Sequence, residues 1–185
     1  NMNIWHDISA DRIKKDDFVA VVEIEKGGTN KYELDKATGL LRLDRVLYTA
    51  THYPANYGFI PRTYAGDGDP LDVLVLVNEP TFPGCVMEVK PIGVFHMADD
   101  KGPDEKVICV PVSDPIWNSL NDLSDMNPHL LKEIEHFFQV YKDLENKSVD
   151  VGGWGDVTEA YDIIKKCTER FNQIENKPEG LFSIK

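Results

Sequence analysis

Three aspartates, Asp67, Asp69 and Asp72, stand within six residues, at the start of the apolar segment LDVLVLV. At ~4 Å apart and an effective dielectric constant of ~20, two carboxylates repel each other by on the order of 4 kcal/mol. Gly68 permits a positive φ angle and Pro70 biases Asp69 towards an extended conformation, so a bent backbone could let the carboxylates converge. Either the side chains diverge into water, or a cation lies between them.

A second acidic segment, MADDKGPDEK, covers residues 97–106 and lies between two apolar segments that read as strands. It contains Asp99, Asp104 and Lys106, and its composition predicts a hairpin loop. Taken alone, it is equally well explained as a solvated turn. Two acidic segments that both join strands of one small sheet favour a shared site.

Common metal and phosphate motifs do not fit the first acidic segment. An EF-hand calcium loop requires Gly at its sixth position and Glu at its twelfth, but counting from Asp67 these positions hold Asp72 and Asn78. In haloacid-dehalogenase-type phosphatases the apolar strand precedes the aspartates, whereas here it follows them. The five histidines have no zinc-site spacing. An oxygen-only ligand set therefore favours a hard cation such as Mg²⁺ or Mn²⁺.

Basic and phenolic residues that could bind an anion occur in other segments. In KYELD, Lys31 and Glu33 share one face of a predicted strand. In LLRLDRVL, Arg45 ends an otherwise apolar row of leucines, where it either extends to solvent or binds an anion. Tyr57 lies in YPANYGFIP, a segment bent by Pro and Gly, and its hydroxyl could donate to a phosphate oxygen.

Strands are predicted first along the chain and helices afterwards, which is the α+β pattern. The turn in LDKATGLL predicts a hairpin, and the regular strand spacing predicts a small, strongly curved sheet or a closed barrel. We expect one domain over residues 1–185, with the barrel at about 18–112, helices at about 127–177 and a loosely held tail at 178–185. The predicted strands are FVAVVEIE, KYELD, LLRLDRVL, DVLVLV, VMEVKPIGVFHM and KVICVPV.

Two amphipathic helices are predicted in the last third of the chain. Asn127, followed by Pro, fits the N-cap of the first, and apolar residues at three- and four-residue steps continue as far as Leu144. Tyr141 belongs to that stripe, so taken alone it reads as a core tyrosine, and Lys142 reads as a solvated lysine. After GGWGD, which reads as a breaker, a D-x-x-E capping box begins the second helix at Asp156.

Composition limits the function classes. The formal net charge of −12 argues against binding to nucleic acid or to anionic membranes, since both require clustered Lys and Arg. No apolar run approaches the ~20 residues of a membrane span, and NMNIWHD lacks the features of a signal peptide. Cys85, Cys109 and Cys167 are far apart and form no CxxC motif, which predicts reduced thiols in a cytoplasmic protein.

Taken together, these segments resemble the soluble family I inorganic pyrophosphatases of the short bacterial type, over about residues 18–154. DGDPLD, residues 67–72, matches the family signature. Two features depart from the family pattern: Glu25 stands where many members have Pro, and the tail after Lys177 matches nothing in the family. The supporting segments are VVEIE, NKYELDK, LDRVL, YPANYGFIP, ADDKGPDEK and HFFQVYKDLE.

The resemblance implies an OB-like β-barrel with flanking helices, a homohexamer, and Mg²⁺-dependent hydrolysis of pyrophosphate to two phosphates. By motif, Asp67, Asp72 and Asp104 hold the first metal ion. Asp69 resembles the base that deprotonates the attacking water, a role also given to the position of Asp99. The implied ligands of further metal ions are Asp99, Asp104, Glu33 and Glu23. The implied phosphate ligands are Lys31, Arg45, Tyr57, Lys106, Tyr141 and Lys142.

A charge count agrees with such a site. Eight acidic and four basic residues leave an excess of four negative charges, which about two divalent cations would neutralise. A protein that only binds divalent cations is an alternative, although it has no need of the basic and phenolic residues. An oligonucleotide-binding barrel would share the architecture but not the acidic surface. The acids counted are Glu23, Glu33, Asp67, Asp69, Asp72, Asp99, Asp100 and Asp104, and the bases are Lys31, Arg45, Lys106 and Lys142.

Overall fold

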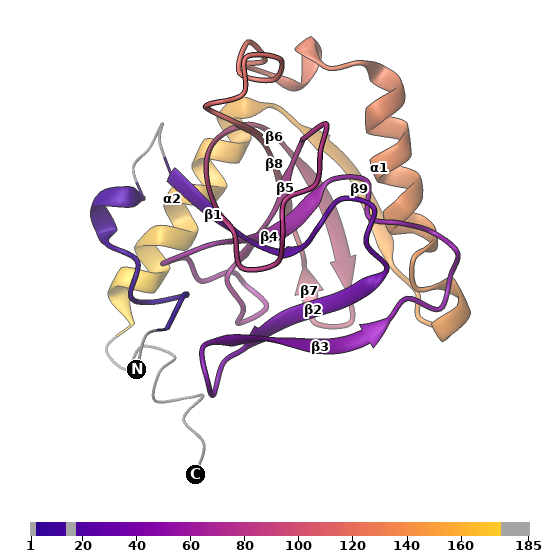
Figure 1. The fold of residues 1–185 in the computed structure, drawn as a ribbon, viewed down its shortest axis with the longest axis horizontal. Coiled ribbons are helices and arrows are strands. Elements are labelled where there is room, and N and C mark those ends of the chain that lie inside the picture. The colour runs from indigo at the N-terminus through magenta and orange to yellow at the C-terminus, as the bar shows by residue number, and fades with distance from the viewer. Residues whose placement is uncertain (1–2, 14–17, 175–185) are drawn as a thin grey trace.

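The structure, a computed structural model, describes residues 3–13 and 18–174 (Figure 1). Its strands are β1 (Phe18–Ile24), β2 (Asn30–Asp35), β3 (Leu40–Val46), β4 (Asn56–Ile60), β5 (Leu71–Val75), β6 (Val86–Asp99), β7 (Gly102–Pro103), β8 (Lys106–Pro111) and β9 (Asp150–Gly155). Its helices are α1 (Pro128–Val140) and α2 (Val157–Gln173), with short 3₁₀ turns η1 (Ala10–Arg12), η2 (Leu123–Asp125) and η3 (Asp143–Glu145). The α+β class expected from the sequence is confirmed.

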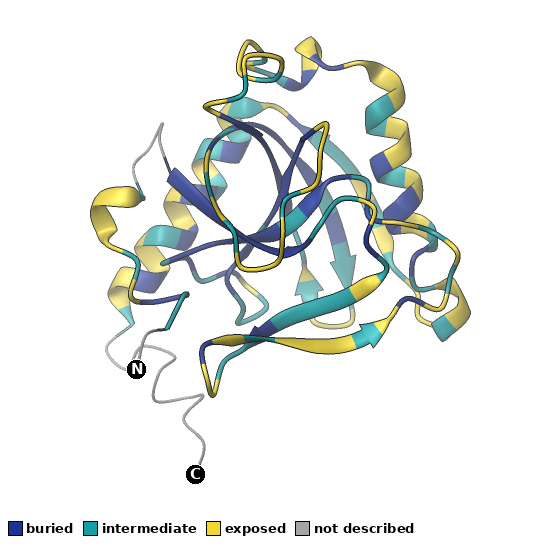
Figure 2. Ribbon diagram, viewed as in Figure 1, coloured by how far each residue is buried: buried dark blue, intermediate teal, exposed yellow. Residues whose placement is uncertain are grey.

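Five strands form the central sheet, and their pairings return to the strand where they began. The order is β1-β4-β5-β8-β6, and β6 pairs again with β1. Only β5 and β8 run parallel among these pairs, whereas β7 and β9 add to β6 in antiparallel fashion. Every residue of β1 and β8 is buried, because these strands are rich in Val and Ile and are covered on both faces (Figure 2).

Side chains alternate along the central strands between two apolar clusters. Leu74 of β5 and Ile108 of β8 belong to the cluster under α1. Val73 of β5 and Val107 of β8 belong to the cluster under α2. The two helices therefore lie on opposite sides of the strands, as Figure 1 shows.

Both helices begin where the sequence predicts. The Asn127 side chain accepts a hydrogen bond from the backbone N–H of His129, with Pro at the first helical position. The Asp156 side chain accepts from the N–H of Glu159. The first helix ends earlier than expected: α1 stops at Val140, and Leu144 lies 65% exposed in η3 instead of continuing the apolar stripe. The predicted tail at 178–185 lies outside the described residues.

The hairpin of β2 and β3 forms a separate two-stranded sheet at one end of the molecule (Figure 1). The predicted turn in LDKATGLL joins the two strands. The predicted apolar row of Leu41, Leu43 and Leu47 is buried only in part: Leu43 is 52% exposed and Leu41 is half-buried, whereas Leu47, just after β3, is 7% exposed. Because the hairpin stands apart from the central sheet, one of its faces remains open to solvent (Figure 2).

Three strands were not expected. YPANYGFIP reads as a bent segment, but its centre forms β4 between β1 and β5. GGWGD reads as a breaker, but it forms the end of β9, which pairs with β6. The third is the two-residue β7, which lies in the predicted hairpin loop and pairs with the end of β6. In β4 and β9, glycine made the segment look irregular, although both segments pair within the sheet.

Candidate active site

A pocket of about 580 Å³ is lined by residues of the β2–β3 hairpin, of β5 and β8, and of the polar loops beside them. Its walls are mostly polar and carry eight carboxylates and six cationic side chains. The excess is two negative charges, half of the value counted from sequence, because Lys36, Arg42 and Lys101 also line the pocket and Arg45 does not. The charged lining residues are Glu23, Lys31, Glu33, Asp35, Lys36, Arg42, Asp67, Asp69, Asp72, Asp99, Lys101, Asp104, Lys106 and Lys142.

The fold brings these residues together from distant parts of the chain. Glu23 comes from β1, and Asp67 and Asp69 come from the loop between β4 and β5. Asp72 of β5 and Lys106 of β8 are register partners on adjacent parallel strands, so their side chains lie on the same side of the sheet. The pocket therefore forms at the point where β5 and β8 meet the polar loops.

Lys106 occupies the centre of the acidic cluster. Its Nζ donates to Asp72 Oδ2 at 2.6 Å, to Asp104 Oδ1 at 2.9 Å and to the Tyr57 hydroxyl at 2.8 Å. Burial alone would lower the pKa of Lys106, but Asp72, Tyr57 and Asp104 outweigh burial, and the pKa lies well above its usual value. A lysine that is only 2% exposed thus stays charged because three acceptors surround it.

Burial shifts the pKa of the nearby carboxylates in different directions. It raises the pKa of Glu23 to about 8, and the charge of Asp72 adds to the effect. Burial also raises the pKa of Asp72, although Lys106 opposes the shift. At Asp104 the balance is reversed, because Lys106 outweighs burial and lowers the pKa. For Asp67, burial raises the pKa. Three of these four carboxyl groups have raised pKa values, so their ionised forms are disfavoured in the pocket. A site with this pattern would be stabilised by additional positive charge.

Phenolic and cationic groups line the side facing α1. Tyr141, the residue that follows α1, is 5% exposed, and burial raises its pKa to about 12. Lys142 lies with its Nζ 5.2 Å from the centre of the Tyr141 ring, and burial lowers its pKa, with Lys31 adding to the shift. Lys31 is within 3.3 Å of Asp44 and 3.8 Å of Glu33. These groups present donors to the same space as the carboxylates.

Arg45 and Asp100, both counted in the site from the sequence, are not in the pocket lining. Arg45 lies beside the pocket. Its guanidinium contacts Asp44 at 2.7 Å and Glu145 at 2.5 Å. Glu145 lies in η3, which follows Tyr141 and Lys142 in the chain, and its side chain is 6% exposed. The pair links the hairpin to the end of α1 beside the pocket.

Sequence reasoning missed two cations at the tip of the hairpin. Lys36 forms an ion pair with Asp69, and Arg42 Nη2 lies 2.5 Å from Glu33 Oε1. Residues 36 and 42 sit in or beside a turn, where charged side chains usually point to solvent. Arg42 lies directly opposite Glu33 across the hairpin, so its contact follows from the β2–β3 register. The contact of Lys36 with Asp69 depends on how the hairpin lies against the β4–β5 loop, which no spacing in the sequence signals.

The pocket lining offers carboxylate oxygens and, among the described residues, no His or Cys side chain. Such oxygen ligands fit hard divalent cations. Within the described residues, however, no three His, Cys, Asp or Glu side chains are arranged so that they enclose an ion. The reason is visible at Lys106, whose ammonium group holds Asp72 and Asp104. Asp67 lines the same pocket as Asp72 and Asp104.

Comparison with known proteins agrees with this site. A family model described as inorganic pyrophosphatase matches residues 20–172. The chain belongs to the inorganic pyrophosphatase family. The pyrophosphatase of Methanosarcina mazei is 50% identical over 153 residues, covering 83% of this chain and 90% of that protein. The Picrophilus torridus pyrophosphatase is 41% identical over 174 residues, covering 94% and 98%.

Solved structures of pyrophosphatases share the fold. The crystal structure of the Thermus thermophilus pyrophosphatase superposes with a TM-score of 0.87 at 41% identity, covering 92% of this chain and 99% of that chain. In the part of the chain that the structure describes, neither pyrophosphatase helix is both long and apolar enough to cross a bilayer.

Proposed function

We propose that this protein hydrolyses inorganic pyrophosphate to two orthophosphates with Mg²⁺, for which Mn²⁺ can substitute. The observation that carries the proposal is the convergence of Asp67, Asp72 and Asp104 with Lys142, Tyr57 and Tyr141 in one pocket of a pyrophosphatase-family chain. Carboxylates alone would serve a cation-binding protein. The cationic and phenolic donors opposite them suit a phosphate-bearing substrate.

Asp67, Asp72 and Asp104 would hold the first metal ion, and Glu23, Glu33 and Asp99 would serve the ions that accompany the substrate. When bound, Mg²⁺ supplies positive charge for the phosphate oxygens and lowers the pKa of a water molecule. The pocket carries an excess of two carboxylates, and pyrophosphate adds further negative charge. Several cations are therefore needed before substrate and carboxylates can share the pocket.

The side chains divide the reaction between them. Asp69 orients the attacking water and accepts its proton, with Asp99 as the alternative acceptor. The water oxygen forms a bond to one phosphorus while the bond from that phosphorus to the bridging oxygen breaks. The second phosphate leaves and keeps the bridging oxygen. Lys106, at the centre of the pocket, donates to the substrate or to its carboxylate partners. The groups that hold the phosphates in line are Lys31, Tyr57, Tyr141 and Lys142, together with Arg45 from the edge of the pocket.

The remaining features of the proposal concern the whole chain. We infer a single domain over residues 1–185 built on a closed OB-like barrel, supported by the pairing of β1 with both β4 and β6. Assembly into a homohexamer is supported by exposed apolar side chains such as Leu43 and Tyr48 of the hairpin region. A cytoplasmic location is supported by the free thiols at Cys85, Cys109 and Cys167.

A phosphate-release assay on pyrophosphate tests the function. We expect phosphate release with Mg²⁺ and none after excess EDTA. Release that persists in EDTA would rule out the metal mechanism. Metal binding measured by calorimetry without any phosphate release would favour a protein that only binds cations.

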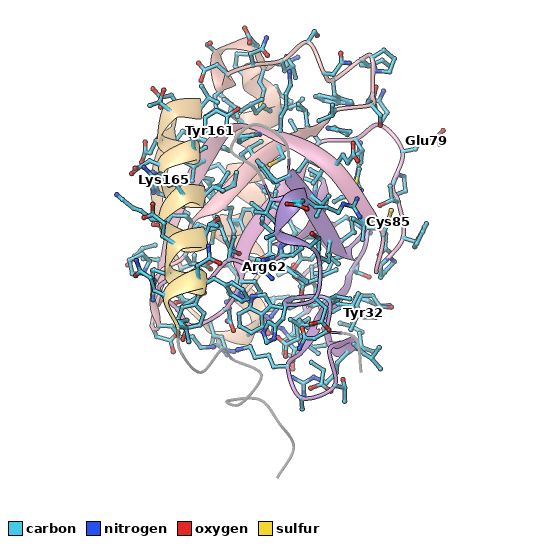
Figure 3. All side chains as sticks on the ribbon, turned by 90° about the vertical axis from the view of Figure 1, so that its left-hand side faces the viewer. Tyr32, Arg62, Glu79, Cys85, Tyr161 and Lys165 are labelled. Carbon is cyan, nitrogen blue, oxygen red and sulfur yellow. The ribbon has the colours of Figure 1, made fainter. Side chains whose placement is uncertain are left out.

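Lys142→Ala tests whether the cationic wall binds substrate. The variant should raise KM for pyrophosphate by roughly tenfold, since a charge-assisted hydrogen bond contributes about 1.5–3 kcal/mol. Lys165→Ala, at an exposed position on α2 (Figure 3), is the matched control. An unchanged KM in the Lys142 variant would remove this residue from the site.

A further inference from the structure

The loop of residues 61–70 between β4 and β5 carries Asp67 and Asp69, and its own hydrogen bonds are few. Ala65 N–H donates to the Asp69 carbonyl at 2.8 Å, and Gly68 N–H donates to the Ala65 carbonyl at 3.1 Å. Asp69 N–H donates to Asp67 Oδ1 at 3.0 Å. A loop with two glycines loses much conformational entropy when it is ordered, so additional contacts are needed to fix where its carboxylates point.

Thr63 joins the two ends of this loop from a fully buried position. Its hydroxyl donates to the Ile60 carbonyl at 2.5 Å and accepts from the Leu71 N–H at 2.9 Å. Ile60 is the last residue of β4 and Leu71 is the first of β5. Ile60 and Leu71 are also paired across the β4–β5 ladder, so the Thr63 side chain reinforces the last pair of that ladder, where the loop leaves the sheet.

The N-terminal segment holds the same end of the loop from outside. The indole Nε1 of Trp5, which is fully buried, donates to the Thr63 carbonyl at 2.8 Å. The Arg62 N–H donates back to the Trp5 carbonyl at 2.8 Å, and Arg62 Nη1 donates to the His6 carbonyl at 3.0 Å. The Trp5 ring stacks on Tyr64 with centroids 6.4 Å apart.

Arg62 shows why such a contact is needed. Its φ angle is +55°, in the left-handed region that a non-glycine residue adopts only when its surroundings impose it. Figure 3 shows Arg62 beside α2, where its guanidinium lies 5.3 Å from the centre of the Phe171 ring. The turn that leads into the acidic loop is thus held between the N-terminal segment and α2.

We propose that Trp5 and Thr63 are positioning residues that hold the acidic loop, and so the carboxylates of Asp67 and Asp69, in the geometry that binds Mg²⁺. The proposal rests on the proposed function for the identity of the metal. Neither residue lines the pocket, so they act through the loop and not on the substrate. Trp5 also lies outside residues 20–172, the part that the family model matches.

Trp5→Phe removes the indole N–H and keeps an aromatic ring in the core. Calorimetry with MgCl₂ in the absence of pyrophosphate should show about fivefold weaker binding, because one buried hydrogen bond is lost. Amide hydrogen exchange over residues 64–71 should become faster by a similar factor, about fivefold. Trp117→Phe is the matched control, since the buried Trp117 N–H has no acceptor in the described structure. It should leave both measurements unchanged.

A second pair of variants keeps the test decisive should Trp5→Phe fold poorly. Thr63→Val removes the hydroxyl at nearly constant volume, and Thr63→Ser retains it. The Val variant should repeat the loss of Mg²⁺ affinity and the faster loop exchange, and the Ser variant should restore both. A purely structural role would lower the melting temperature with wild-type Mg²⁺ affinity and loop exchange, and that result would overturn the proposal. Wild-type protein that binds Mg²⁺ without releasing phosphate would overturn the proposed function alone.

Discussion

Lys106 determines the electrostatics of the pocket because the register of β5 and β8 places it next to Asp72. Three acceptors surround one ammonium group, so removal of any one partner leaves the others with altered charge and hydrogen bonding. Glu23 accepts a hydrogen bond from the Leu34 N–H at 3.0 Å, and burial, with the charge of Asp72, raises its pKa to about 8. Neighbouring carboxylates thus respond differently to pH and to metal.

Asp72→Asn tests the central carboxylate. We expect turnover to fall by roughly a hundredfold or more, because a preorganised charged group is removed from the pocket. The fold should persist, since Asn keeps the volume and one acceptor oxygen, and circular dichroism would verify this. Asp11→Asn, at an exposed position, serves as the control. Near-normal turnover in the Asp72 variant would contradict the site.

Glu23→Gln tests the raised pKa in the metal-free protein. Because burial raises the pKa of Glu23 from 4.5 to about 8, the folded state binds an extra proton between these values, and stability is lost as pH rises through about 8. Gln cannot ionise, so the variant should exceed wild type at pH 8.5 by on the order of a few kcal/mol and match it near pH 4.5. Urea unfolding in EDTA measures this, and a variant less stable at pH 8.5 would contradict it.

The elements around the pocket differ in how deeply they are buried. The central strands are buried, whereas the hairpin of β2 and β3 has one exposed face. Contacts of Lys36 with Asp69 and of Arg45 with Glu145 tie this hairpin to the β4–β5 loop and to the end of α1. The position of the hairpin therefore depends on these ion pairs, whereas the central strands are held by buried apolar side chains.

Asp156→Ala tests the capping of α2, the helix that covers one apolar cluster. Loss of the hydrogen bond from the Glu159 N–H should cost about 1 kcal/mol. For a chain of this size the melting temperature should fall by about 2–4 °C. Asp162→Ala, exposed on the same helix, is the control and should change the melting temperature less. Equal shifts in both variants would contradict the capping role.

Glycine explains the strands that could not be predicted. A Cβ at Gly58 of β4 would lie 1.9 Å from the Val21 carbonyl oxygen, so glycine is needed there for a close approach to β1. In β9, Gly153 has a φ of +104° at an irregularity in the pairing with β6. Sequence patterns treat such glycines as breaks, because the neighbouring strand that requires them lies far away along the chain.

The molecule as a whole is acidic, yet its pocket is closer to neutral than the sequence count indicated. Motif residues could be found from sequence because DGDPLD and its companions are locally recognisable. Arg45 and Lys36 could not be placed, because their partners Glu145 and Asp69 are brought to them by the fold. Strand order, which depends on the β1–β6 pairing, was equally hidden.

Thiol labelling tests how closely the molecule is packed. Burial raises the pKa of Cys167 to about 11 and that of Cys109 well above its usual value, so both remain thiols at pH 8. Cys85, labelled in Figure 3, is half-buried. Mass spectrometry after iodoacetamide should show one modified cysteine in the native protein and three after denaturation. Native labelling of Cys167 as fast as Cys85 would contradict this packing.

The ammonium group between Asp72 and Asp104 also bears on how the protein folds. A lysine built into the chain offsets the repulsion between the two carboxylates, so folding does not have to wait for an ion from solution.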